Sequence, residues 1–81
     1  MKINEDKIDD ATLALLHLVT CERYEDFGAR AWKGFDWDTM DRLYKKGLIR
    51  DPKGKQKSVV MTEEGCQKSK HLFETLFMNE E

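Results

Sequence analysis

The chain has 81 residues and a formal net charge of −2 at pH 7, and 40% of its residues are hydrophobic, 37% charged and 10% aromatic. A chain of this length buries one hydrophobic core, so we expect a single domain over residues 1–81. The aromatic content excludes a typical disordered chain, and the slightly acidic balance disfavours a uniformly basic nucleic-acid-binding domain.

A membrane-spanning or secreted protein is also disfavoured. No stretch approaches the roughly 20 consecutive apolar residues that a membrane helix requires. The first residues lack the basic and then apolar order of a signal peptide. We therefore expect a cytoplasmic protein in which Cys21 and Cys66 are reduced thiols.

The first predicted element is an amphipathic helix from about Lys7 to Arg23. Apolar residues recur along it at steps of three and four: Ile8, Ala11, Leu15, Leu18 and Val19. This spacing places them on one helix face. Leu13 and Leu16 widen that face, and Asn4 or Asp6 can cap the start of the helix.

A short second helix is predicted from Tyr24 to Gly34, with Phe27, Ala31 and Trp32 on one face. Aromatic residues gather around its end: Phe27, Trp32, Phe35 and Trp37. Such a cluster can line a small-molecule pocket. In a chain this small, we favour the interpretation that the cluster is part of the core.

The third predicted helix begins at a cap, Asp36, and ends at Gly47, which can adopt the left-handed conformation of a helix stop. Its spacing places Met40, Leu43 and Tyr44 on the inner face. We expect these three residues to be buried together with Leu48, which follows the helix.

Two short strands, Leu48–Arg50 and Ser58–Met61, are predicted next, joined by a turn that contains Pro52 and Gly54. Thr62 can cap a final helix. Its apolar side is formed by Cys66, Ser69, Phe73, Leu76 and Phe77. The predicted fold is therefore mainly α within the α+β class: a three-helix core, a two-stranded β-hairpin and a C-terminal helix.

The segment Met40–Arg50, followed after the turn by Val59–Gly65, resembles MarR- and PadR-type winged-helix regulators. The shared pattern is "L-x-x-K-G-L-I" and then a threonine, two glutamates and a glycine. The whole chain also resembles a family of short uncharacterised bacterial proteins. The winged-helix resemblance implies a helix-turn-helix protein that binds double-stranded DNA as a dimer and regulates transcription.

One strip of the chain carries the candidate nucleic-acid contacts: Arg42, Lys45, Lys46, Arg50, Lys53, Lys55 and Lys57. Basic side chains hold phosphates. The lysines of the hairpin can equally protect an exposed strand edge from pairing with other chains.

Acidic residues precede this strip, because Asp36, Asp38 and Asp41 lie at the start of the third helix. Asp38 is four residues before Arg42 and Asp41 four before Lys45, a spacing typical of neutralising pairs. The alternative function is therefore a protein-interaction module that presents this acidic edge and Trp37 to a partner.

Catalytic chemistry is not indicated, since no Ser-His-Asp arrangement, phosphate-binding glycine loop or isolated carboxylate pair occurs. Two His–Cys pairs are the candidates for a zinc site: His17 with Cys21, and Cys66 with His71. The second pair is separated by about 140° around a helix, which suits a shared ion poorly. We therefore expect no enzyme activity, no metal and no cofactor.

The last helix carries more large apolar residues than docking on a small core requires. The candidate interface residues are Leu72, Phe73, Leu76 and Phe77. We expect a symmetric homodimer through this face. In the alternative, the N-terminal helix covers the whole surface.

Overall fold

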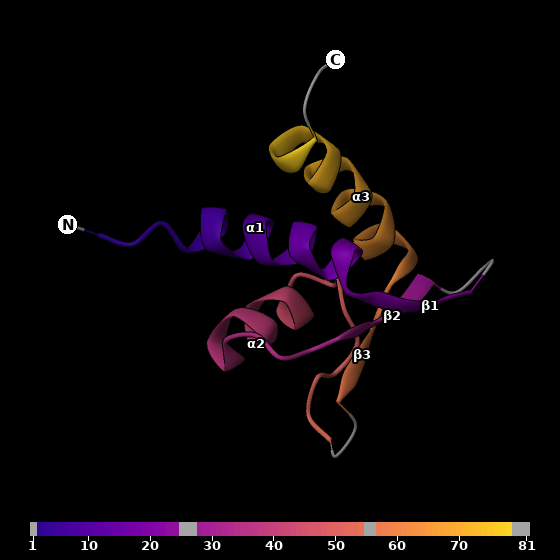
Figure 1. Cartoon of the computed structure of the whole chain (residues 1–81). Coiled ribbons are helices and arrows are strands. Elements are labelled where there is room, and N and C mark those ends of the chain that lie inside the picture. Colours follow the sequence, from indigo (N-terminus) through magenta and orange to yellow (C-terminus); the bar gives the residue numbers. More distant parts are fainter. Residues whose placement is uncertain (1, 25–27, 55–56, 79–81) are drawn as a thin grey trace.

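The computed structural model describes residues 2–24, 28–54 and 57–78 of the chain. Over these residues its elements are, in order, α1 Glu5–Leu18, β1 Thr20–Tyr24, β2 Gly28–Trp32, α2 Trp37–Lys45, β3 Ser58–Met61 and α3 Glu63–Phe77. Figure 1 shows α1 running between α3 and α2, with the strands gathered beyond its C-terminal end. The described part of the chain is thus an α+β fold, and this part of the prediction is confirmed.

The three strands form one antiparallel sheet in the order β1-β2-β3. The central strand β2 pairs Ala29 with Met61 and Ala31 with Val59 of β3. The opposite edge of β3 is partly covered by residues 48–50, where Ile49 forms an isolated bridge with Met61.

The core lies where α1, α2 and α3 meet the sheet. Its buried apolar side chains are Leu13, Leu16, Ala29, Ala31, Met40, Leu43, Leu48, Ile49, Val59 and Met61. The two alanines of β2 are small, which allows helices to approach the central strand closely.

Close packing also fixes the start of α3. A Cβ on Gly65 would collide with the Leu48 carbonyl oxygen, so only glycine allows this helix to lie against residue 48. One turn later, the buried Ser69 hydroxyl donates to the Leu13 carbonyl oxygen of α1 at 2.5 Å. α3 is therefore held by backbone contacts as well as by apolar packing.

The predicted helix ends are largely confirmed. The side chains of Asn4, Asp36 and Thr62 accept hydrogen bonds from the backbone N–H groups three residues later, which caps α1, α2 and α3. After α2, Gly47 adopts a φ of 77°, the left-handed conformation that favours glycine.

The predicted second helix from Tyr24 to Gly34 is wrong, because residues 28–32 form β2. Pairing with a strand on each side satisfies the backbone groups of this segment. The first helix is also shorter than predicted: it ends at Leu18, and β1 begins at Thr20.

Two predictions of buried faces need correction. In α1 the buried residues include Leu13 and Leu16, whereas Ile8 and Leu18 are exposed. In α2, Met40 and Leu43 are buried with Leu48 as predicted, but Tyr44 is 43% exposed.

The predicted two-stranded hairpin is also corrected, because the main partner of β3 is β2. Residues 48–50 supply a short ladder instead: Arg50 N–H donates to the Val60 carbonyl oxygen at 2.8 Å, and Thr62 N–H to that of Leu48 at 3.1 Å. In the described residues, the structure contains no helix with the length and apolar character needed to cross a membrane.

Candidate functional site

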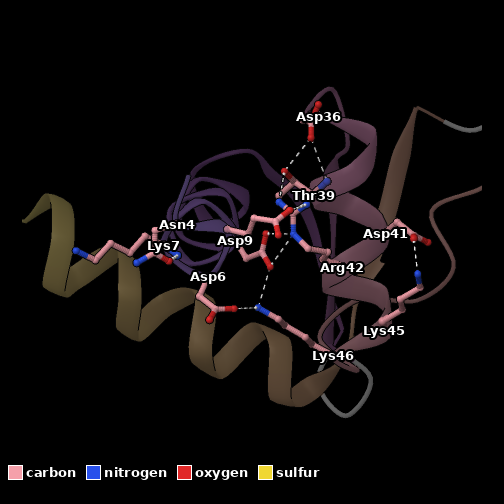
Figure 2. A network of polar contacts seen from close by, with 11 residues as sticks. Asn4, Asp6, Lys7, Asp9, Asp36, Thr39, Asp41, Arg42, Lys45 and Lys46 are labelled. Carbon is pink, nitrogen blue, oxygen red and sulfur yellow. Dashed lines mark hydrogen bonds and ion pairs between the residues drawn. The ribbon is translucent and has the colours of Figure 1, made fainter. Parts of the chain in front are cut away.

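A buried carboxylate joins α1 to α2. Asp9 of α1 is 1% exposed, and its two oxygens accept hydrogen bonds from Arg42 Nε at 2.9 and 3.1 Å. Lys46, the C-terminal cap residue of α2, donates from Nζ to Asp9 Oδ2 at 2.8 Å. Figure 2 shows both cations reaching from α2 to this single acid.

The network continues outward to solvent. Arg42 Nη1 lies 3.0 Å from Glu5 Oε2, and Lys46 Nζ lies 3.1 Å from Asp6 Oδ1. Arg42 also donates from Nη2 to the Thr39 hydroxyl oxygen at 3.1 Å, and that hydroxyl donates to Asp36 at 3.0 Å. Each cation is thus held by an inner and an outer carboxylate.

Both cations are stabilised in their charged form. The hydrogen bond to Asp9 is the largest cause that raises the pKa of Arg42 and of Lys46 above their usual values, and Glu5 and Asp6 raise them further. A phosphate would have to displace these carboxylates to bind either side chain.

The third predicted cation of α2, Lys45, is paired with Asp41 at 3.0 Å. This pair was predicted from its four-residue spacing and is confirmed. The predicted partner of Arg42 was Asp38, but Arg42 extends across to α1 instead. All three predicted phosphate contacts on α2 are therefore engaged within the chain.

The remaining predicted cations lie after α2. Arg50, Lys53 and Lys57 are exposed, and Lys55 lies outside the described residues. Lys33, which sequence reasoning did not select, joins this region: its Nζ donates to the carbonyl oxygens of Pro52 at 2.6 Å and Gly54 at 3.2 Å. Its backbone N–H also donates to the Lys57 carbonyl oxygen at 3.0 Å.

Beside these lysines lies a shallow depression of about 490 Å³. Its lining consists of Trp32, Lys33, Gly34, Phe35, Trp37 and Lys57. Trp32 is 51% exposed and Trp37 is 62% exposed, so the prediction that they belong to the core is wrong. Phe35 packs against the core as predicted, and Phe27 lies outside the described residues.

The depression combines flat apolar rings with positive charge. Lys33 Nζ lies 5.8 Å from the ring centroid of Trp37, within the range of a cation–π interaction. We use the name basic-aromatic surface for Trp32, Lys33, Trp37, Lys53 and Lys57. The sequence predicted an aromatic cluster and a basic strip as separate features. It did not predict that they lie together on one surface.

A second depression, of about 680 Å³, lies beside the N-terminal ends of α1 and α2. Three acidic residues and two exposed isoleucines are among its lining: Glu5, Asp36, Asp38, Ile3 and Ile8. Glu5 is paired with Arg42, and Asp36 caps α2. Of the acids predicted to face a partner, Asp36 is thus engaged as a helix cap and Asp41 in its ion pair with Lys45, whereas Asp38 lines the depression.

The C-terminal end of α3 exposes apolar side chains. Leu76, Phe77 and Met78 are exposed, whereas Leu72 and Phe73 are half-buried. A groove of about 410 Å³ beside this end is lined by Lys7, Asp10, Ala11, Leu72 and Leu76. The groove therefore runs between α1 and α3.

The candidate zinc ligands have separate surroundings. The ring of His17 packs against that of Phe73 at a tilt of 49°, with the ring centroids 5.1 Å apart, and burial and the neighbouring Arg23 lower the pKa of His17. Burial raises the pKa of the Cys66 thiol, while the exposed Cys21 donates from Sγ to a backbone carbonyl oxygen. Within the described ranges, no three His, Cys, Asp or Glu side chains are grouped to hold a metal ion.

The chain is similar to known sequences over almost its whole length. A family model described as a domain of unknown function, DUF6429, matches residues 4–79. The uncharacterised protein y4hR of Sinorhizobium fredii (strain NBRC 101917 / NGR234) is 54% identical over 77 residues, which cover 95% of this chain and 97% of that protein. No solved structure matches the chain. The predicted resemblance to a family of short uncharacterised bacterial proteins is thus confirmed, and the chain belongs to the DUF6429 family.

Proposed function

We propose that this protein is a nucleic-acid-binding domain that contacts phosphates through its basic-aromatic surface rather than through α2. The observation that carries the proposal is that the cations of the chain fall into two groups, one paired with carboxylates and one exposed. Arg42, Lys45 and Lys46 are neutralised by carboxylates of the chain, whereas Lys53 and Lys57 are exposed around the loop that Lys33 holds.

The positions of the positive charges support phosphate contacts on the basic-aromatic surface. Lys33 donates to the backbone on both sides of Lys53 and is hydrogen-bonded through its own backbone to Lys57. Three positive charges therefore come from one small region of a chain whose net charge is only −2. Such a local basic region can bind phosphates even on a mildly acidic protein.

A role in transcription regulation of the winged-helix kind is part of this proposal. It is supported by the order of the second half of the chain, in which α2, the turn at Gly47, the ladder of residues 48–50 with β3, and α3 follow one another. MarR- and PadR-type regulators share this order. In our proposal the loop before β3 takes the part of their wing.

Binding can be measured by the fluorescence anisotropy of labelled duplex and single-stranded oligonucleotides over a range of salt concentrations. We expect binding that weakens as salt rises, because phosphate contacts release counterions. Changing Lys53 and Lys57 together to Ala should weaken binding to all sequences alike and reduce the slope of log K against log salt by about 1–2.

A matched control is available on α3, where Lys68 and Lys70 are also exposed. Changing these two to Ala removes the same charge from another surface and should leave binding unchanged. Equal losses in the two double variants, or no binding of the original chain at low salt, would refute the proposal.

We also propose that two copies associate through the C-terminal end of α3. Leu76 and Phe77 are exposed there, and the adjoining groove has Lys7 and Asp10 among its lining. These two residues have opposite charges on neighbouring turns of α1, so a two-fold axis can place Lys7 of one copy near Asp10 of the other. A symmetric interface needs this kind of self-complementarity.

A protein-interaction module is the second candidate function. The depression between the starts of α1 and α2 favours it, because exposed Ile3 and Ile8 lie there beside Asp38. An apolar surface with an acidic rim suits a basic partner segment. Changing Ile3 and Ile8 to Ser should then abolish capture of that partner and leave oligonucleotide binding unchanged.

A further inference from the structure

We infer that the basic-aromatic surface binds unpaired bases, so that the preferred ligand is single-stranded nucleic acid. This inference rests on the proposed nucleic-acid-binding function, and it specifies a single strand in place of the duplex DNA that winged-helix regulators bind. It starts from the two tryptophans, which sequence reasoning had placed in the core and which the structure exposes on one depression.

Exposed tryptophans are costly to leave in water, because each ring presents a large apolar area. Trp32 is 51% exposed at the end of β2, and Trp37 is 62% exposed in the first turn of α2. Both line the same shallow depression, which is open rather than enclosed by a deep pocket. A flat ligand can therefore cover either ring face without entering the core.

The charge around the rings indicates an anionic ligand. Lys57 lines the depression with the two tryptophans, and Lys33 lies 5.8 Å from the Trp37 ring centroid. Lys33 also holds the backbone on each side of Lys53. Flat rings interleaved with lysines match a chain that alternates bases and phosphates, since bases stack on aromatic side chains while cations follow the backbone.

Unpaired bases fit this surface better than a duplex does. Within a duplex each base face is covered by its neighbours, so a tryptophan ring can stack only on a terminal pair or on a base that has left the helix. The helix that would read a major groove, α2, carries exposed Asp38 in its first turn, and its cations are engaged with acids of the chain. A duplex docked along α2 would bring its phosphates against Asp38, whereas a single strand on the depression meets Lys33 and Lys57, which line it.

Intrinsic fluorescence offers a direct readout, because Trp32 and Trp37 are the two tryptophans of the whole sequence. The full chain is titrated with a 12-nucleotide oligothymidylate, with a duplex of equal length and with inorganic polyphosphate. We expect the single strand to quench the fluorescence and to bind about tenfold or more tightly than the duplex. Polyphosphate should bind without comparable quenching.

Substitutions of the two tryptophans test whether their rings contact the single strand. Trp32→Ala and Trp37→Ala should each lower affinity for the single strand about tenfold, measured by anisotropy, with little effect on polyphosphate binding. Trp37→Phe should retain part of the affinity because a ring remains. Tyr44→Ala is the control: Tyr44 is an exposed aromatic of the same helix that does not line the depression. Circular dichroism verifies that each variant is folded.

The outcomes separate this inference from the function on which it rests. Salt-dependent binding of the duplex as tight as that of the single strand, without quenching, would overturn the inference and leave nucleic-acid binding in place. Equal losses on Tyr44→Ala and Trp37→Ala would also overturn it. Failure of every oligonucleotide to bind at low salt would refute both.

Discussion

Lys46, at the C-terminal end of α2, donates to the buried carboxylate of Asp9 on α1 at 2.8 Å, although 37 positions separate the two residues in the sequence. Arg42, one turn earlier, donates to the same carboxylate. The acid is thus shared by two cations and lies where α1 packs on α2. The charge of Asp9 stabilises the packing of α1 on α2. It also neutralises Arg42 and Lys46, which could otherwise bind phosphate.

Asp9→Asn should lower the free energy of unfolding by about 1.5–3 kcal/mol, the usual contribution of a hydrogen bond to a charged group. The amide keeps the shape of the side chain but loses the charge that two cations require. Arg42 and Lys46 are partly exposed and can turn to water, which limits the loss. Urea denaturation measures the difference.

Asp41→Asn is the matched control, because Asp41 makes an ion pair with Lys45 within α2 at 3.0 Å. The side chains of Lys45 and Asp41 are 73% and 41% exposed, so the expected loss is only a few tenths of a kcal/mol. If the two variants lost the same stability, the buried network would not have the structural role assigned to it.

The ion pairs of this network were only partly predictable from the sequence. Spacing within α2 predicted the pair Asp41–Lys45 correctly, but the pair Asp38–Arg42, predicted from the same spacing, is replaced by contacts of Arg42 with α1. It did not predict the pairs between α1 and α2, which depend on how the helices pack. One sign was present in the sequence: Asp9 lies four residues before Leu13 and seven before Leu16, so it shares the buried face of α1. An acid on an apolar face requires partners.

The strand β2 was missed for a different reason. Its sequence, GARAW, contains alanine and arginine, which have high helix propensity, and no β-branched residue. Pairing with β1 and β3 determines its conformation. The caps Asp36 and Thr62 and the stop at Gly47 were predictable, because each depends on its own residue and a few neighbours.

Gly65→Ala should destabilise the domain by several kcal/mol, despite the higher helix propensity of alanine. The added methyl group would collide with the Leu48 carbonyl oxygen, and backbone has little freedom to move aside. Gly34→Ala is the control, because an added Cβ there meets no atom within 4 Å. Thermal denaturation should show a large loss for the first variant and little change for the second.

His17 should make the stability depend on pH. Burial and Arg23 lower its pKa in the folded chain below the usual value of about 6.5. Between these two pKa values the unfolded chain binds more protons, so stability falls as pH drops below about 6.5. His17→Gln should lose less stability than the original chain between pH 7.5 and 5.5.

The control for this pH effect is His71→Gln, which removes an exposed histidine of α3. Urea denaturation of all three chains at each pH provides the comparison. A pH dependence abolished by His71→Gln and kept by His17→Gln would contradict the assignment. The tilted contact of His17 with Phe73 gives the physical reason for the expected order, since it shields part of the imidazole from water and so disfavours the charged form.

The proposed dimer predicts a sedimenting mass of about twice that of the 9.5 kDa chain at micromolar concentration. Changing Leu76 and Phe77 together to Ser should dissociate it, because exposed apolar side chains at the centre of an interface supply much of its binding energy. Both side chains are about half exposed in the single chain, so the substitutions should leave the core intact.

Leu18→Ser is the control, since Leu18 is 65% exposed at the other end of α1 from the groove residue Lys7. A single species of 9.5 kDa for the original chain would refute the dimer. A dimer that persisted in the double variant and dissociated in Leu18→Ser would place the interface on another face.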